Sequence, residues 1–375
     1  MRFTINSPLI EGLEKKYVNN VLKEGWLSSN GEHTKIFEKK ISKYLKIKHS
    51  LAVQSGTAAI HLALKSFNCK NGDNIVLPNY SCVSNISAVK QCGANPIIVE
   101  VEKETLGIDF NQLIKAIKKY KPKVVQLVHV YGCPARDTYK IKSLCKKNKI
   151  FLMEDFSEAL GAKINNKNVG TIGDISISSI RSEKMIGVGE GGVVVCNNTK
   201  LFKKIKTLAS RNSPFRRKYD PYWKKYYSLG EGYNYLLPHL LGAVARAQIE
   251  KFEKSILQKK ILLGKNYHKI FETNDISITQ KVPKNFKSVY WLNTIYFKNK
   301  SVSSIRRIGK FLEKNGVEVR SGFWPMNKLK NFNSKYVGSE RVSENIFDNI
   351  IVLPSNLNIK YKDILYFKKL IEKKL

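Results

Sequence analysis

The sequence predicts an α/β fold, with a large domain on a mostly parallel β-sheet and a small C-terminal αβ domain. Between about residues 50 and 200, short β-branched runs alternate with helical stretches. These runs are continuously apolar, which is typical of strands that helices cover on both faces of a sheet. After about residue 275 the pattern changes to alternation and a lysine-rich amphipathic stretch. We therefore place the large domain, with its N-terminal segment, at 1–250 and the small domain at 251–375.

Each apolar run of the large domain is followed by a turn or a helical pattern. The stretch from 200 to 262 is predicted to be helical, with an aromatic and basic insertion at 214–227. In the small domain, 289–297 alternates like a strand, and a helix is expected near 303–314. The strands expected in the large domain are 51–54, 74–77, 96–101, 124–130, 150–154, 175–178 and 192–196.

The composition is that of an ordinary globular chain, with 42% hydrophobic and 26% charged residues. No apolar run reaches about 18 residues, the length that crosses a membrane, and the first residues show no apolar core of a secretion signal. Six cysteines are scattered without a CxxC pair, and the six histidines form no HxxxH or HExxH pattern. We expect a cytoplasmic protein with reduced thiols, no metal site and no membrane partner.

The formal net charge of +36 permits two interpretations. Clustered basic residues neutralise phosphates in nucleic-acid binding proteins. Here only eleven of the 66 basic residues are arginine, and the lysines are spread along the whole chain. Sequence-reading modules rely on arginine and on one concentrated patch. We favour a general lysine bias and expect no nucleic-acid partner, although the charge can attract an anionic, phosphate-bearing substrate.

A single lysine, Lys184, lies between an expected strand end and the glycine-dense turn 187–192. A lysine that forms an imine must be held away from bulk water so that its amine is nucleophilic. The glycines let the backbone pass close to a flat cofactor and take positive φ. The alternative is a surface lysine before a hairpin, since several lysines of this chain will fall near glycine by chance.

Asp155 follows the buried run 150–154, at the carboxyl edge of the expected parallel sheet. Open α/β folds bind ligands at this edge. A carboxylate there can pair with a pyridine nitrogen, keep it protonated and make the ring an electron sink. The alternative is a helix N-cap, a common role of aspartate after a strand.

A phosphate site is indicated where the run 51–54 turns into an amphipathic helical pattern. Gly56 and Thr57, with Ser55 before them, offer hydroxyls and backbone N–H groups at a helix N-terminus, which binds anions. Helix capping alone would also explain the serine and threonine. Ser179, five residues before Lys184, offers another hydroxyl for the same phosphate.

These motifs stand in an order and spacing that chance rarely produces. On them the chain resembles the DegT/DnrJ/EryC1/StrS family of nucleotide-sugar aminotransferases, and the resemblance runs nearly end to end. It implies the type I fold of aspartate aminotransferase, with pyridoxal 5′-phosphate (PLP) as the cofactor. Among the subfamilies, the GDP-perosamine synthases look most similar, on the segments 26–31 and 319–325. The matching segments are 25–31, 55–57, 128–132, 154–155, 158–159, 184 with 189–192, 232–235, 243 and 247–248.

The resemblance implies a cofactor role for each matching residue. Lys184 would form the Schiff base with PLP and move the proton during transfer of the amino group. Asp155 would pair with the pyridine nitrogen, and Glu158 would lie near the phenolic oxygen. The residues implied to bind the cofactor phosphate are Gly56, Thr57 and Ser179.

The resemblance also implies partners and substrate contacts. Asn234 is expected to reach the cofactor phosphate of a neighbouring subunit, so that a homodimer shares its active sites. Candidates for substrate contacts are Trp26, Ser28, His129 and Arg320. For Trp26 the alternative is hydrophobic packing, because tryptophan is so often buried.

Two departures from the family's pattern bear on cofactor and substrate. Cys82 stands where the family places an aromatic ring on the cofactor face, and a thiol gives weaker face contact than a ring. Either cofactor affinity is lower or Tyr80 compensates. The usual Phe-Ser-Phe before the lysine is Ser-Ser-Ile here, followed by Arg181, which leaves the sugar open. Some members carry histidine in place of the lysine and act as dehydratases, and Lys184 argues against that chemistry.

The reaction implied is PLP-dependent transamination of a nucleotide-linked keto-deoxy sugar with glutamate as amino donor. GDP-4-keto-6-deoxymannose would be converted to GDP-perosamine, a step in amino-sugar and O-antigen or polysaccharide biosynthesis. Another UDP- or dTDP-linked keto sugar, aminated at C3 or C4, or a small keto or aldehyde compound, is an alternative. A non-catalytic binding protein of the same fold is suggested only by the charge.

Overall fold

The main sheet of the computed structural model has eight strands in the order β1-β9-β8-β5-β4-β2-β3-β13. The model describes residues 1–213 and 228–375, so the insertion expected at 214–227 lies outside the described residues. Only β9 runs antiparallel to its neighbours, so the prediction of a mostly parallel sheet is confirmed. The strands are β1 His49–Val53, β2 Asn74–Pro78, β3 Asn95–Val99, β4 Val124–Val128, β5 Phe151–Asp155, β8 Ile175–Ser179, β9 Gly192–Cys196 and β13 Lys335–Val337.

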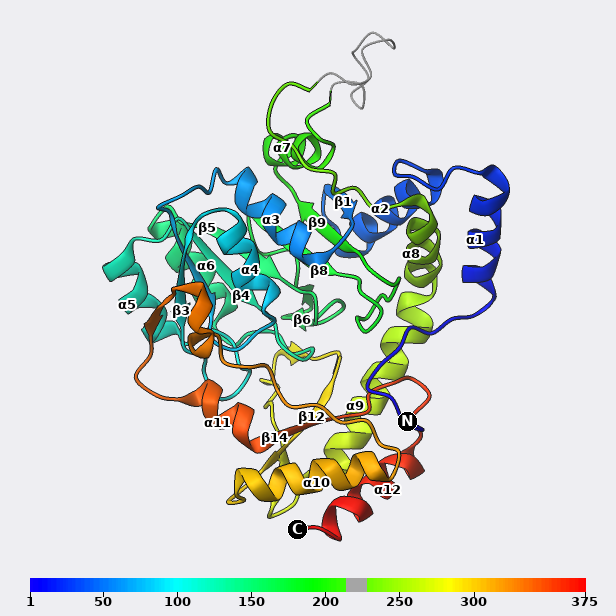
Figure 1. Cartoon of the computed structure of the whole chain (residues 1–375), viewed down its shortest axis with the longest axis vertical. Helices are drawn as coiled ribbons and strands as arrows, with labels where there is room; N and C mark the ends of the chain where they lie inside the picture. Colours follow the sequence, from blue (N-terminus) through cyan, green and yellow to red (C-terminus); the bar gives the residue numbers. More distant parts are fainter. Residues whose placement is uncertain (214–227) are drawn as a thin grey trace.

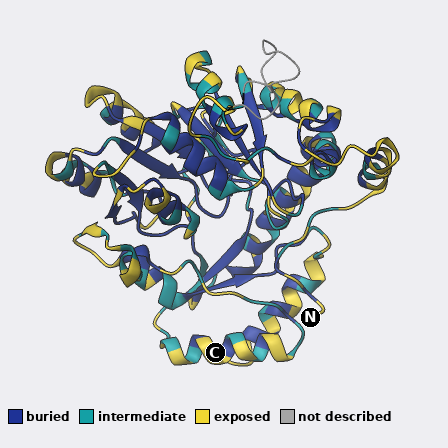
Figure 2. Ribbon diagram, turned by 45° about the horizontal axis from the view of Figure 1, so that its top comes forward, coloured by how far each residue is buried: buried dark blue, intermediate teal, exposed yellow. Residues whose placement is uncertain are grey.

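Helices cover both faces of this sheet, which explains its continuously apolar strands (Figures 1 and 2). Successive residues of one strand serve opposite faces: Val76 packs in one apolar core, and Ile75 and Leu77 pack in the other. On one face lie α3 Gly56–Ser66, α4 Ser84–Gln91 and α7 Thr199–Ala209. On the other lie α2 Glu32–Leu45, α5 Phe110–Tyr120, α6 Thr138–Lys147 and α8 His239–Lys251.

A second, antiparallel sheet of three strands lies below the first in Figure 1. It packs against α9, α10 and α12 around a core of its own. Phe3 joins this core and pairs with Val317, so the first residues of the chain pack with its last third. The elements are β10 Ile276–Ile278, β12 Asn293–Phe297, β14 Ile350–Leu353, α9 Gln258–Phe271, α10 Val302–Lys314 and α12 Tyr361–Glu372.

Several connections complete the chain. A π-helical segment, η2 Phe252–Leu257, joins α8 to α9 in one long helical run. The described residues include no helix that could span a membrane and no cluster of side chains that could hold a metal ion. All six cysteines are unpaired. The remaining elements are α1 Gly12–Glu24, β6 Lys163–Ile164, β7 Lys167–Asn168, β11 Phe286–Lys287, η3 Met326–Lys328, η4 Lys330–Phe332 and α11 Val342–Asn349.

Candidate active site

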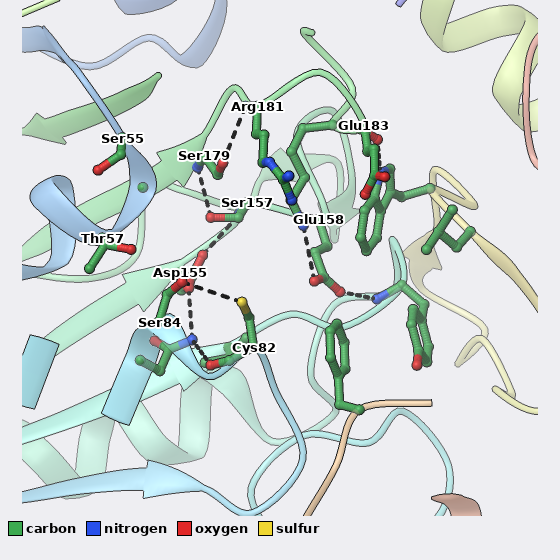
Figure 3. A pocket seen from close by; sticks show the side chains of 18 of the residues that line it. Ser55, Thr57, Cys82, Ser84, Asp155, Ser157, Glu158, Ser179, Arg181 and Glu183 are labelled. Atoms are coloured by element: carbon green, nitrogen blue, oxygen red, sulfur yellow. Dashed lines mark hydrogen bonds and ion pairs between the residues drawn. The ribbon is translucent and has the colours of Figure 1, made fainter. Parts of the chain in front are cut away.

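A cavity of about 520 Å³ opens at the carboxyl ends of β4, β5 and β8, where residues of the second sheet face the main sheet (Figure 3). Val128, Asp155 and Ser179 line it from the strand ends, and Val352 lines it from β14. Eight predicted site residues line this cavity: Gly56, Thr57, Cys82, Asp155, Glu158, Ser179, Lys184 and Arg320.

Lys184 lies in the connection from β8 to β9, and its amine points into the cavity. The amine is 3.1 Å from Oε1 of Glu158 and 3.6 Å from the centre of the Trp291 ring. The connection folds back on itself, because Ser182 N–H donates to the Gly189 carbonyl, and Gly189 takes a φ of 104°. With 13% of its side chain exposed, Lys184 is not the surface lysine of the alternative interpretation.

Glu158 is the acidic partner of the lysine. Burial raises the pKa of its carboxyl, and the Lys184 ammonium offsets part of that rise. The backbone N–H of Tyr131 donates to its Oε2 at 2.9 Å. The carboxylate is therefore held between a lysine and a backbone donor, with both oxygens bonded.

Asp155 ends β5 and is 4% exposed. Its Oδ1 accepts from Ser157 N–H at 2.9 Å, and its Oδ2 accepts from the Asn85 amide at 3.3 Å. No helix follows β5: the chain turns and enters the short β6–β7 hairpin. The helix N-cap interpretation of Asp155 is therefore wrong, and its buried carboxylate faces the cavity instead.

The N-terminus of α3 lines the cavity beside Ser179, at the end of β8. Ser55 caps the helix, accepting from Ala58 N–H at 3.0 Å, so the capping interpretation holds for this residue. Gly56 and Thr57 lie in the first turn, where backbone N–H groups have no partner within a helix. A Cβ on Gly56 would lie 2.9 Å from Cβ of Ser179. Only glycine at position 56 therefore leaves the space between the helix and the strand open.

Arg320 lines the cavity, but its guanidinium is already paired. It contacts both carboxylate oxygens of Glu183 at 2.8 and 3.0 Å, and Glu318 at 2.9 Å. Arg320 lowers the pKa of the Glu183 carboxyl through this contact. The structure thus joins Arg320 to the residue before Lys184 rather than leaving it free in the cavity.

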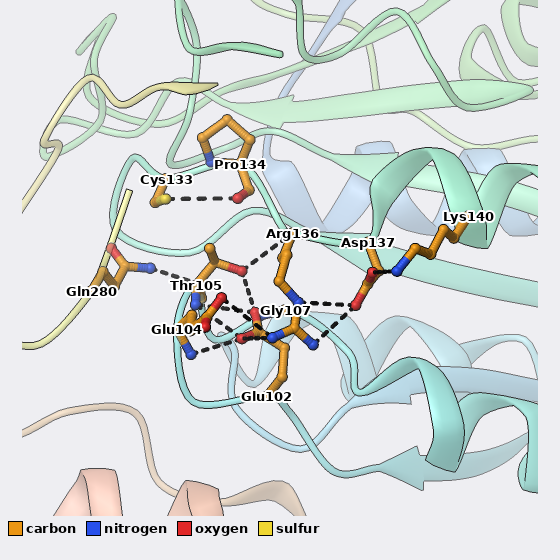
Figure 4. Close-up of polar contacts among 10 residues, drawn as sticks. All are labelled: Glu102, Glu104, Thr105, Gly107, Cys133, Pro134, Arg136, Asp137, Lys140 and Gln280. Carbon is orange, nitrogen blue, oxygen red and sulfur yellow. Dashed lines mark hydrogen bonds and ion pairs between the residues drawn. The ribbon is translucent and has the colours of Figure 1, made fainter. Parts of the chain in front are cut away.

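His129, predicted to contact substrate, does not line the cavity, and that prediction is corrected. Its ring is fully buried: Nδ1 accepts from Ala135 N–H, so Nε2 carries the hydrogen that faces Glu154 at 3.0 Å. The histidine holds the loop that carries Tyr131 into the cavity wall. Figure 4 shows a second polar network, at the end of this loop, in which Arg136 contacts Glu102 at 3.6 Å.

Three further predicted residues lie outside the cavity of this subunit. Trp26 is 57% exposed in this chain, so it is not packed in the interior of its own subunit. Ser28 lies in the same exposed loop between α1 and α2. Asn234 is exposed and pairs with Ser210 through the backbone.

Several residues of the cavity were not predicted from the sequence. Trp291 lay in a stretch read as strand, but β12 begins only at 293, and the turn before it carries the ring to Lys184. Asn85 reaches Asp155 from α4, a contact that no sequence pattern signals. Ser157 accepts from Ser179 N–H at 2.8 Å and places a third hydroxyl near the α3 end.

Comparison with known proteins decides the family. The model of the DegT/DnrJ/EryC1/StrS aminotransferase family matches residues 8–370. The chain belongs to this family. It is 32% identical to the GDP-perosamine synthase of Vibrio cholerae, covering 87% of this chain and 86% of that one. It is 30% identical to the GDP-perosamine synthase of Escherichia coli O157:H7, covering 96% and 95%.

A solved structure of a GDP-4-keto-6-deoxymannose-3-dehydratase, ColD, with bound GDP-perosamine shares the fold. Its TM-score is 0.88 at 21% identity, with 98% of this chain and 100% of that chain covered. The type I aminotransferase fold predicted from the sequence is confirmed. As a member of this family, the protein is a PLP-dependent aminotransferase.

The side chains of the cavity fit PLP. An α-helix N-terminus with hydroxyls at 57, 157 and 179 suits the phosphate. Asp155 suits the pyridine nitrogen, since it is a buried carboxylate with one amide donor and one backbone donor. Lys184 would supply the amine to which PLP binds covalently.

Proposed function

We propose that the protein transfers an amino group from glutamate to GDP-4-keto-6-deoxymannose and so forms GDP-perosamine. The observation that carries this proposal is one cavity that gathers Lys184, Asp155 and the N-terminus of α3, in a chain that is 30% and 32% identical to two GDP-perosamine synthases. The product would serve amino-sugar and O-antigen or polysaccharide biosynthesis.

In this proposal the residues of the cavity have different roles. PLP, when bound, supplies an aldehyde that takes up amino groups and a ring that accepts an electron pair. Lys184 moves the proton, because its amine lies inside the cavity between Glu158 and the Trp291 ring. Asp155 keeps a proton on the pyridine nitrogen. Gly56, Thr57, Ser157 and Ser179 hold the phosphate and so fix the position of the ring.

We further propose a cytoplasmic homodimer whose sites are completed by the neighbouring subunit. The resemblance implies active-site roles for Trp26, Ser28 and Asn234, yet all three are exposed and lie outside the cavity of their own chain. A second subunit that brings these residues to the cavity would account both for the implied roles and for the exposed positions. Six unpaired cysteines fit a reducing compartment.

The test is a substrate panel. Purified protein is incubated with glutamate and each of the GDP-, UDP- and dTDP-linked 4-keto and 3-keto sugars, and 2-oxoglutarate and amino-sugar products are measured. GDP-4-keto-6-deoxymannose should be converted fastest, with ping-pong kinetics. Faster conversion of another sugar would replace the proposed substrate. A salt-sensitive gel shift with nucleic acid and no turnover on any sugar would favour a binding protein instead.

A further inference from the structure

Lys260 lies inside the molecule, on α9, and has no part in the reaction described above. It is 2% exposed, and its amine donates to three oxygens: Asn6 Oδ1 and the Trp291 carbonyl, both at 3.0 Å, and the Ser355 carbonyl. Within the described part of the chain, none of its partners is a carboxylate. Burial lowers the pKa of Lys260 to about 7. Burying an amine costs free energy, so the presence of a lysine at this position calls for an explanation.

Two of these three partners also hold the residue before Lys184. The Asn6 amide donates to the Glu183 carbonyl at 2.5 Å, and the Trp291 indole N–H donates to the same oxygen at 2.5 Å. Lys260 is thus linked to one carbonyl by two separate bridges, one from the N-terminal segment and one from the turn before β12. The Trp291 ring also lies against the amine of Lys184.

We propose that Lys260 is a positioning residue that fixes the backbone before Lys184 through Asn6 and Trp291, and so aims the catalytic amine. This rests on the proposed function, in which Lys184 is the cofactor-binding lysine. Three acceptors around one amine match the three donors of an ammonium group. An error of 1 Å in the position of a reacting group can cost about 10²-fold in rate.

Lys251 provides a matched control. It too is a buried lysine on the same helical run, with 8% of its surface exposed. Its amine binds the Leu9 carbonyl at 2.6 Å and pairs with Glu14 at 2.7 Å. It therefore also ties the N-terminal segment to the helix, but its bonds lead away from Glu183.

The experiment compares covalent and non-covalent cofactor binding in Lys260→Met, Lys251→Met and the unchanged protein. Each apoprotein is mixed with PLP, borohydride is added at timed intervals, and the adduct on Lys184 is counted by peptide mass. Affinity for pyridoxamine phosphate, which needs no bond to the lysine, is measured by titration, and thermal unfolding is followed in parallel. We expect Lys260→Met to form the adduct about tenfold or more slowly, with pyridoxamine phosphate affinity unchanged and Lys251→Met like the unchanged protein.

Two milder variants keep the inference testable if Lys260→Met does not fold. Trp291→Phe keeps a ring against Lys184 and removes the indole donor, and Asn6→Ala removes the other bridge. Each should slow adduct formation. Where Lys260→Met does fold, adding it to the Asn6→Ala/Trp291→Phe double variant should slow adduct formation little further, because both bridges to the Glu183 carbonyl are already gone.

Three results would overturn the inference. The first is that Lys260→Met, or the Asn6→Ala/Trp291→Phe double variant, forms the adduct at the normal rate. The second is an equal loss in Lys251→Met, and the third is a loss of pyridoxamine phosphate affinity in proportion to the adduct. Either of the last two would mark a purely structural lysine. Absence of an adduct on Lys184 in the unchanged protein would instead contradict the proposed function.

Discussion

Asp155 shows how the chemistry depends on single side chains. Its carboxylate is buried, with one oxygen held by a backbone N–H and the other by the Asn85 amide. These two donors stabilise a negative charge at the cavity wall and leave it directed at a cationic partner. A protonated pyridine nitrogen is such a partner.

Asp155→Asn tests this role. The substitution keeps the size of the side chain but removes the charge, and a hydrogen bond to a charged group contributes about 1.5–3 kcal/mol, so turnover should fall roughly 10- to 100-fold. The Asn85 amide can turn its oxygen toward the new amide, so the thermal unfolding temperature should change little. Steady-state kinetics and thermal unfolding measure the two effects. Unchanged turnover would show that Asp155 is only structural.

At the scale of elements, the buried carboxylate of Glu154 fixes the turn that follows the β6–β7 hairpin. It accepts from the backbone of Gly170, Ile172 and Gly173, in addition to its contact with His129. Burial alone would raise the pKa of Glu154, but the bonds from His129 and the backbone outweigh it and lower the pKa overall. The turn leads into β8, which ends at Ser179 beside the proposed phosphate site.

Glu154→Gln should destabilise the protein by about 3 kcal/mol at pH 7, because the bonds lose their charge. A carboxyl with a lowered pKa contributes stability above its unfolded pKa, and this stability is lost as the pH falls through the folded pKa. The difference from the unchanged protein should therefore shrink as the pH falls below 4.5. Urea unfolding at a series of pH values measures it. A difference that is constant with pH would contradict the ionised state of Glu154.

The elements themselves were largely predictable, because the strands of the main sheet other than β13 are mostly apolar runs between turn residues. The ends of the elements were less predictable. The strand expected from 289 begins at 293, so Trp291 was expected within a strand and its place in the cavity was not predicted. The edge strand β13 was not expected, since it has three residues and pairs with β3, far away in the sequence. Contacts of this kind depend on how the whole chain folds, not on local pattern.

The same limit applies to the site. Lys184, Asp155 and Gly56 stand in local motifs, and the structure brings all three to one cavity. His129 also stands in such a motif, but its neighbours Glu154 and Ala135 hold it inside the protein. A motif therefore indicates which loop forms the site, whereas packing decides which side chain of that loop faces it.

At the scale of the whole molecule, the proposed homodimer makes a quantitative prediction. Lys184→Ala and Asn234→Ala would each damage every site of their own dimers. In a mixed dimer, one site would carry both changes and the other neither. Mixing the two variants under exchange conditions should therefore restore about a quarter of the activity of the unchanged protein, as expected for two-fold symmetric sites shared between subunits. No recovery in a verified mixed dimer would contradict shared sites.

The most direct test of the central claim is to locate the cofactor on the chain. The protein is saturated with PLP, reduced with borohydride and digested, and the modified peptide is identified by mass. We predict a single modified peptide, with the cofactor on Lys184, and a Lys184→Ala variant that forms no adduct and shows no turnover. An adduct on another lysine, or normal turnover by Lys184→Ala, would contradict the assignment of Lys184 as the catalytic residue.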